Sequence, residues 1–190
     1  MRLLYLIRHA TPVVQPDTPA RDWPLGERGV EEANALAVTA RSWDLSALYS
    51  SSEPKARTTA LIIGDAVGLD VNVVDAFDEL RIPQWIGNAD EFNDAVRAIL
   101  VEASAAPRGA ETAGAAADRF AGGIGLISQG PFPAALVSHG RILTAWLMRA
   151  VGIEDPFEVW RTMPMPGYAC IDLDALGAGF IVPFAPSAAR

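Results

Sequence analysis

The sequence predicts an α/β sandwich built on a mainly parallel sheet. Short apolar runs of strand length recur along the chain, and segments with apolar residues at helical spacing separate them. The 190 residues suit one domain with a sizeable core, and no internal repeat divides them. We therefore treat residues 1–190 as a single domain.

The elements of the first half follow from apolar patterning and from helix start and stop signals. The run from Leu3 to Ile7 is almost wholly apolar, which is typical of a strand buried on both faces. Pro54 suits the first turn of a helix, and Gly68 suits its end. In order, we expect a strand over 3–7, a Pro-rich loop over 11–24, a helix over 27–41, a strand over 45–50, a helix from 54 to 68, and a strand over 71–74.

The second half opens with residues 75–87, which show no clear period and are predicted to form a loop. After this loop we expect helices over about 89–103 and 112–127, a strand over 133–137, a helix from 140 to about 151, a short helix over 156–161, and closing strands over 169–173 and 180–182. Strands and helices thus alternate along most of the chain, which favours parallel strands joined by helices.

Composition excludes several classes of function. The 15 Lys and Arg residues stand against 23 Asp and Glu, and no basic stripe exists to neutralise nucleic-acid phosphates, so we expect no nucleic-acid partner. One cysteine, Cys170, and two histidines are too few for a disulfide framework or a Cys- or His-rich metal site, and we expect no cofactor. No apolar run reaches the ~18–20 residues of a membrane span, and the first run is too short for a secretory signal. We therefore expect no membrane partner and a cytoplasmic location.

The two histidines both follow predicted strands. His9 comes directly after the first strand, and His139 comes after the strand over 133–137. Ligands of open α/β sheets bind beyond the carboxyl ends of the strands, so both side chains are expected at the same edge of the sheet. Because the chain has no other histidine, we interpret the pair as one functional site.

The sole lysine, Lys55, lies in the predicted first turn of a helix that follows a strand. A cation is unfavourable at a helix N-terminus unless an anion binds there, because that end of the helix carries partial positive charge. Arg57 is the competing cation, but two residues on a helix point ~200° apart, so only one of them can face a given pocket.

Arg8, His9, Lys55 and His139 together would form a positive cluster in a chain of net charge −8, and phosphate is the natural anion for it. A neutral imidazole can attack phosphorus, while the remaining groups balance the charge of the phosphoryl oxygens. The leaving alkoxide needs a proton from a carboxylic acid. Three candidates for this acid lie in the loop after the third strand: Asp75, Asp78 and Glu79.

Five segments in order resemble those of the histidine phosphatase superfamily, also called phosphoglycerate-mutase-like. The segments are Leu6-Ile7-Arg8-His9-Ala10, Trp23-Pro24-Leu25-Gly26-Glu27-Arg28-Gly29, the stretch from Ser50-Ser51 to Thr59-Ala60, Ala110-Glu111-Thr112 with Arg119, and Val137-Ser138-His139-Gly140. They extend through nearly the whole chain, whereas a single dipeptide would be weak evidence. Gly26 stands where the family usually has Thr.

The resemblance implies a three-layer α/β/α sandwich and a metal-independent mechanism with a phosphohistidine intermediate. It makes His9 the nucleophile and gives Arg8 and His139 the task of holding the phosphoryl group. The family's second phosphate-binding arginine falls on Lys55, which keeps the charge but loses the bidentate geometry. The family's general acid falls on Glu79, with Asp78 as the alternative if the alignment shifts by one residue.

The favoured function is a phosphatase that acts on small phosphorylated substrates. Three alternatives stay open: a phosphoglycerate-mutase-type phosphotransferase, a phosphoprotein phosphatase, and a non-catalytic phosphate-binding module. The mutases of the family look longer and begin Arg-His-Gly-Glu, whereas this chain continues with Ala10-Thr11. Arg21 and Arg81 are candidates for contact with a second anionic group, and the sequence predicts neither the substrate nor the oligomeric state.

Overall fold

The computed structural model describes residues 1–83 and 86–186 of the chain. Its six strands form one sheet in the order β3-β2-β4-β1-β5-β6. Strands β1 to β4 run parallel, and β5 pairs antiparallel with both β1 and β6. The strands are β1 (Leu3–Arg8), β2 (Ala47–Ser50), β3 (Val71–Val73), β4 (Ala134–Ser138), β5 (Gly167–Asp172) and β6 (Val182–Pro186). The mainly parallel sheet predicted from the sequence is confirmed.

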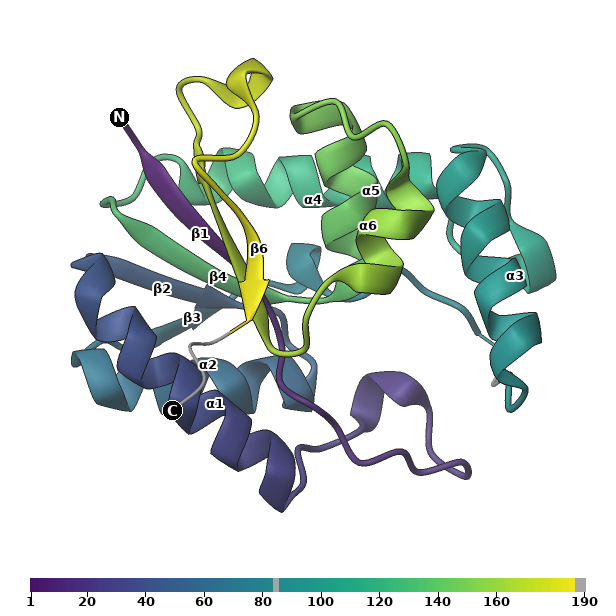
Figure 1. The fold of residues 1–190 in the computed structure, drawn as a ribbon, viewed down its shortest axis with the longest axis horizontal. Helices are drawn as coiled ribbons and strands as arrows, with labels where there is room; N and C mark the ends of the chain where they lie inside the picture. Colours follow the sequence, from purple (N-terminus) through teal and green to yellow (C-terminus); the bar gives the residue numbers. More distant parts are fainter. Residues whose placement is uncertain (84–85, 187–190) are drawn as a thin grey trace.

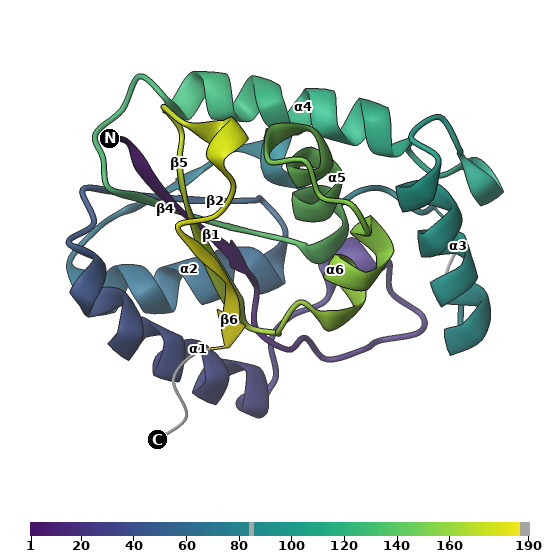
Figure 2. The same ribbon diagram turned by 45° about the horizontal axis from the view of Figure 1, so that its top comes forward.

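Helices cover both faces of the sheet and complete the three layers (Figure 1). One face carries α1 (Glu27–Ala40) and α2 (Pro54–Val67), and the other carries α4 (Ala113–Ile127) and α5 (Gly140–Ala150). The turned view in Figure 2 separates these two layers on either side of the strands. Two further helices, α3 (Ala89–Val101) and α6 (Pro156–Thr162), pack against each other and against α5.

The strand pattern explains why the core has two halves. Leu4 and Leu6 point towards α4 and α5, whereas Ile7 points towards α1 and α2, because successive strand residues face opposite sides. All five residues of β4 are buried, since this strand lies between β2 and β1 with helices on both faces. The apolar run over 133–137 therefore marks a strand that has no solvent-exposed face.

Most element ends agree with the signals in the sequence. Pro54 is the first residue of α2, and Gly68 ends the helix in the left-handed conformation with φ 73°. The last strand differs from the prediction, because β6 spans 182–186 whereas the sequence predicts a strand over 180–182. Pro183 and Pro186 lie in this strand, and proline is tolerated there because β6 is at the edge of the sheet, where a missing N–H does not break the ladder.

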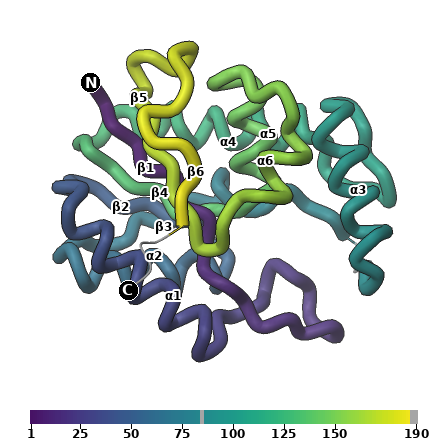
Figure 3. The backbone as a smooth tube through the Cα atoms, in the orientation of Figure 1, coloured from purple at the N-terminus to yellow at the C-terminus, as the bar shows by residue number. Residues whose placement is uncertain are grey.

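The fold brings the distant strand ends together. Arg8 pairs with Ser138 in the parallel register of β1 and β4, and the His9 N–H donates to the Ser138 carbonyl at 3.0 Å. The loop after β1 and helix α3 extend from the same end of the sheet, as the tube in Figure 3 shows. This end, beyond the carboxyl ends of the parallel strands, is where the sequence predicts a ligand.

Candidate active site

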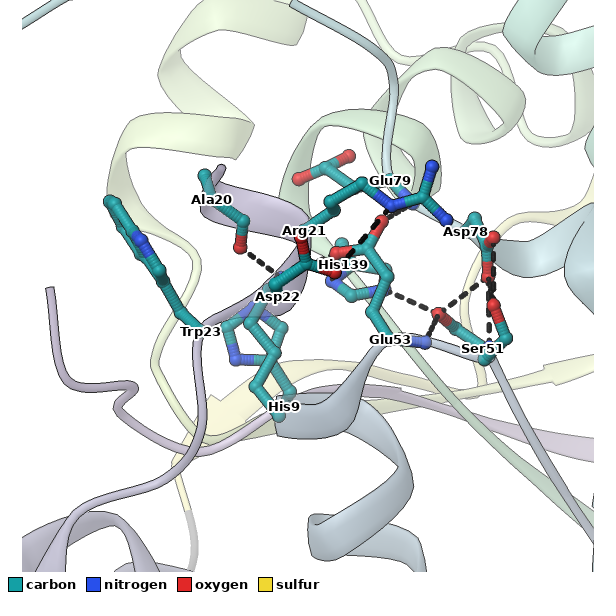
Figure 4. Close-up of polar contacts among 12 residues, drawn as sticks. His9, Ala20, Arg21, Asp22, Trp23, Ser51, Glu53, Asp78, Glu79 and His139 are labelled. Carbon is teal, nitrogen blue, oxygen red and sulfur yellow. Dashed lines mark hydrogen bonds and ion pairs between the residues drawn. The ribbon is translucent and has the colours of Figure 1, made fainter. Parts of the chain in front are cut away.

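The two histidines lie next to each other, as predicted from their places after two strands. Because β1 and β4 are neighbours in register, His9 and His139 leave the sheet at the same level. Their ring centroids are 5.0 Å apart in an edge-to-face arrangement, and both residues are buried. Figure 4 shows the pair with Glu53 and Glu79 close by, and with Trp23 on the side away from Ser51 and Asp78.

The hydrogen bond of His9 fixes which ring nitrogen carries the proton. Its Nδ1 lies 2.7 Å from the carbonyl oxygen of Ala10, which can only accept, so Nδ1–H donates and Nε2 keeps its lone pair. Burial, with the charge of Lys55, lowers the pKa of His9 to about 3. The imidazole is therefore neutral near pH 7 and offers Nε2 as a nucleophile.

His139 is held by a chain of hydrogen bonds that ends at Asp78. Its Nε2 lies 2.8 Å from the Ser51 hydroxyl, which donates in turn to Asp78 Oδ1 at 2.9 Å. Because the serine proton goes to the carboxylate, His139 donates from Nε2 and directs Nδ1 to the opposite side. Burial, with the charges of His9 and Lys55, lowers the pKa of His139 well below its usual value.

The three predicted acids have different surroundings. Asp78 accepts from the Ser51 hydroxyl and from both the N–H and the hydroxyl of Ser52, at 2.8–2.9 Å, so it holds the turn between β2 and α2. Asp75 is exposed in a short 3-10 helix. Glu79 and Asp78 both line the cavity described below, but the Asp78 carboxylate is engaged by the two serines.

The Glu79 carboxylate sits against the N-terminus of α5. It accepts from the N–H groups of Leu80 at 2.8 Å, Ile142 at 2.9 Å and Arg141 at 3.3 Å, and the Arg141 guanidinium lies 3.3 Å from Oε2. Arg141 is not among the residues that the sequence predicts for the site. Its position two residues after His139, at the start of a helix, was the available signal.

Lys55 points into the site, and Arg57 does not. The Lys55 side chain is buried and its ammonium donates to the Ala20 carbonyl at 2.8 Å, whereas Arg57 is exposed. Lys55 also forms an ion pair with Glu53, a second cavity residue that the sequence does not predict for the site. Glu53 looks like an ordinary residue before a helix, and only the fold shows that its carboxyl group faces inward.

Arg8 approaches the backbone at the start of α5. Its Nη1 donates to the Met163 carbonyl at 2.7 Å, and Nε is buried with no hydrogen-bond partner among the described residues. A Cβ added at Gly140 would lie 3.2 Å from Arg8 Nε and Cζ. Glycine at this position of the second-histidine segment therefore gives the guanidinium the space that it occupies.

The segment with Glu111 and Arg119 supports the loop that carries Glu79. Arg119 makes two hydrogen bonds to the Glu111 carboxylate, at 2.8 and 3.0 Å. Its Nη1 donates to the carbonyls of Ala76 and Asp78, each at 2.9 Å. These two residues thus act on the site through the backbone on either side of Phe77 and immediately before Glu79.

These groups surround a cavity of about 460 Å³. Its polar lining consists of Arg8, His9, Arg21, Glu53, Lys55, Asp78, Glu79, Arg81 and Arg141. Its apolar lining consists of Pro12, Pro19, Ala20, Trp23, Leu80, Ile82, Pro83, Ile86, Phe92, Trp160 and Met165. The described part of the chain contains no cluster of three or more His, Cys, Asp or Glu residues suited to a metal ion. Within the same residues, no helix is both long enough and apolar enough to cross a membrane.

Solved structures similar to this chain include phosphatases and a mutase. A mycobacterial glucosyl-3-phosphoglycerate phosphatase in complex with inorganic phosphate has a TM-score of 0.75 at 21% identity, with 99% of this chain and 96% of that chain covered. A phosphoserine phosphatase from Entamoeba histolytica, in complex with 3-phosphoglyceric acid, has a TM-score of 0.73 at 17% identity, with 100% of this chain and 98% of that chain covered. A phosphoglycerate mutase from Bacillus anthracis has a TM-score of 0.72 at 19% identity, with 95% of this chain and 91% of that chain covered.

Identities this low show a shared fold and leave the substrate open. No curated protein matches the chain. The model of the histidine phosphatase superfamily (branch 1), in contrast, matches residues 4–175, which include all five segments singled out above. This chain belongs to the histidine phosphatase superfamily, branch 1.

Proposed function

We propose that this chain is a metal-independent phosphatase that hydrolyses small phosphomonoesters through a phosphohistidine on His9. The observation that carries the proposal is the tautomer of His9. Its Nδ1–H donates to the Ala10 carbonyl, which leaves the Nε2 lone pair on a neutral ring that lines the cavity. The charges of Lys55, Arg8 and Arg141 act on the same imidazole, so a phosphoryl group bound there has cations around its oxygens.

The reaction then has two steps. His9 Nε2 attacks phosphorus, the P–O ester bond breaks, and the ester oxygen leaves with the electron pair and takes a proton from Glu79. Water next attacks the phosphohistidine and gives a proton to Glu79, which releases phosphate and restores the neutral His9. Arg8 and Lys55 hold the phosphoryl oxygens through both steps. For His139 to join them, as the family resemblance implies, its Nδ1 must take up a proton, because its Nε2–H is directed to Ser51.

The walls of the cavity favour an apolar leaving group. Beyond His9 and the charged groups its described lining is aliphatic, aromatic, proline or methionine, and it includes no Ser, Thr, Asn, Gln or Tyr. A sugar or polyol buried against such walls loses hydrogen bonds to water without regaining them, whereas an aryl or alkyl group gains from burial. We therefore propose that aryl and alkyl phosphates are hydrolysed with a higher kcat/KM than sugar phosphates.

The test is hydrolysis of p-nitrophenyl phosphate by the wild type, His9→Ala and Arg57→Ala. We expect His9→Ala to lose at least about a thousandfold in kcat, as nucleophile removal does in other hydrolases, and Arg57→Ala to stay close to wild type. A chelator should leave the wild-type rate unchanged. Equal, negligible rates for all three proteins over a broad ester panel would support the non-catalytic alternative.

The panel separates the remaining alternatives. It includes p-nitrophenyl phosphate, a short alkyl phosphate, glucose 6-phosphate, a phosphoserine peptide and 3-phosphoglycerate. Conversion of 3-phosphoglycerate to its isomer without release of phosphate would establish a mutase, and a preference for the peptide would establish a phosphoprotein phosphatase. Preference for the sugar phosphate would overturn the leaving-group proposal while leaving the phosphatase intact.

A further inference from the structure

Glu53 is a buried carboxyl group in the phosphate cavity that the reaction above does not use. It precedes α2, and its side chain is 6% exposed. Its carboxylate pairs with the Lys55 ammonium and accepts from the Glu79 N–H at 2.9 Å. Its Oε2 lies 3.8 Å from His139 Nδ1, an atom that is buried without a hydrogen-bond partner among the described residues.

The ionised groups of the cavity leave little positive charge for a phosphate dianion. Lys55, Arg8 and Arg141 are the cations that act on His9. Three carboxyl groups line the same cavity, namely Glu53, Asp78 and Glu79. Both histidines are neutral, because burial and nearby cations lower the pKa of each. Arg21 and Arg81 also line the cavity but are exposed, so water screens their charges. The three remaining cations balance the three carboxyl groups when every carboxyl group is ionised.

The hydrogen bonds show which carboxyl group can accept a proton. Asp78 accepts from Ser51 and Ser52, and Glu79 accepts from three N–H groups and lies beside the Arg141 guanidinium, so donors surround both carboxyl groups. Glu53 has fewer such donors. Burial raises the pKa of its carboxyl group, while Lys55 opposes this shift and the charge of Glu79 adds to it.

We propose that Glu53 positions Lys55 in the free protein and takes up a proton when a phosphate dianion binds. The proposal rests on the phosphate-binding part of the proposed function. One proton moves from solvent to the Glu53 carboxylate, its ion pair with Lys55 ends, and the ammonium pairs with a phosphoryl oxygen instead. No other bond changes, and the site gains one positive charge to match the bound dianion.

The test is calorimetric titration of inorganic phosphate into the wild type and Glu53→Gln, in two buffers that differ in ionisation enthalpy. The protonation of phosphate itself is common to both proteins, so the difference in proton uptake reports on Glu53. We expect the wild type to take up about one more proton per phosphate than the variant. Its affinity should then fall up to about tenfold more per pH unit as the pH rises through neutrality.

This result differs from that of a merely structural role. At pH 8 we expect Glu53→Gln to bind phosphate more tightly than the wild type, because a carboxylate that repels the dianion has gone. Equal proton uptake by the two proteins, or weaker binding by the variant at every pH, would overturn the proposal. Glu53→Leu provides a second variant with the same expectation if the glutamine protein does not fold.

Two controls identify the carboxyl group involved. Glu31→Gln removes an exposed carboxyl group on α1 and should leave proton uptake unchanged. Glu79→Gln should show the same extra proton uptake on phosphate binding as the wild type. Loss of this uptake in Glu79→Gln would assign the protonated carboxyl group to Glu79 and not to Glu53. The proposal for Glu53 and the proposed phosphatase activity can fail separately. If hydrolysis depends on His9 but the wild type and Glu53→Gln take up equal numbers of protons, only the proposal for Glu53 is contradicted. Uptake that depends on Glu53 without any hydrolysis contradicts only the phosphatase.

Discussion

At the scale of single residues, the site is defined by which hydrogen-bonding group faces which partner. His9 donates from Nδ1 to a carbonyl and His139 donates from Nε2 to Ser51, so the two rings direct different nitrogens towards the space between the strand ends. The first ring keeps a lone pair on Nε2, as the proposed attack on phosphorus requires, and the second is fixed in orientation by Asp78 through Ser51. The same residue types without these partners would have no fixed tautomer.

Lys55 and Arg57 provide a matched pair of cations two residues apart on α2. We expect Lys55→Ala to weaken phosphate binding about a hundredfold, because a buried cation in the cavity is lost, whereas Arg57→Ala should change it less than twofold. The measurement is inhibition of p-nitrophenyl phosphate hydrolysis by inorganic phosphate. The opposite ranking would show that Arg57 occupies the place of the family's second arginine.

At the scale of elements, the close approach of two backbone segments explains why a glycine, Gly29, ends the family segment that begins at Trp23. Gly29 lies in the first turn of α1, where an added Cβ would lie 2.2 Å from the Thr11 carbonyl oxygen. Glycine therefore lets α1 pack onto the chain that leaves the His9 strand. The close approach of Gly29 to Thr11 thus positions both α1 and the start of the loop over residues 11–24, and any larger side chain at position 29 would prevent it.

Two glycine-to-alanine changes test this packing. Gly29→Ala should destabilise the protein by about 2–4 kcal/mol, because the new methyl group collides with backbone that cannot move aside without displacing α1. Gly122→Ala, on an exposed position of α4 with nothing within 4 Å, should instead stabilise it by about 0.5–1 kcal/mol. Urea unfolding of both variants measures the difference. Similar effects of the two changes would contradict the assigned contact.

At the scale of the whole molecule, the sequence was sufficient wherever one local pattern determined the outcome. Apolar runs predicted the parallel strands, and the rule for strand ends predicted that His9 and His139 meet. The sequence was insufficient for Glu53, because its partners Glu79 and His139 are far away in the chain. The start of β6 also depends on pairing with β5, so local hydrophobicity placed it two residues early.

Burial of both histidines in the neutral form makes the stability of the whole molecule sensitive to acid. The unfolded chain binds protons on them below about pH 6.5, whereas the folded pKa of His9 is about 3 and that of His139 is also well below its usual value. The unfolded state thus binds more protons in this window, so the free energy of unfolding falls as the pH decreases from about 6.5. Glu53 contributes with the opposite sign, because burial raises the pKa of its carboxyl group.

Replacing one histidine should remove part of this pH dependence. In urea unfolding between about pH 6 and 4, we expect His9→Gln to reduce the slope of the unfolding free energy by up to about 1.4 kcal/mol per pH unit, the contribution of one proton. Because the chain has only two histidines, the residual imidazole contribution belongs to His139. An unchanged slope would mean that the pKa of His9 in the folded protein lies close to its unfolded value of about 6.5. The ring would then lose its lone pair to a proton below that pH, so this measurement of stability also tests whether burial keeps the proposed nucleophile neutral.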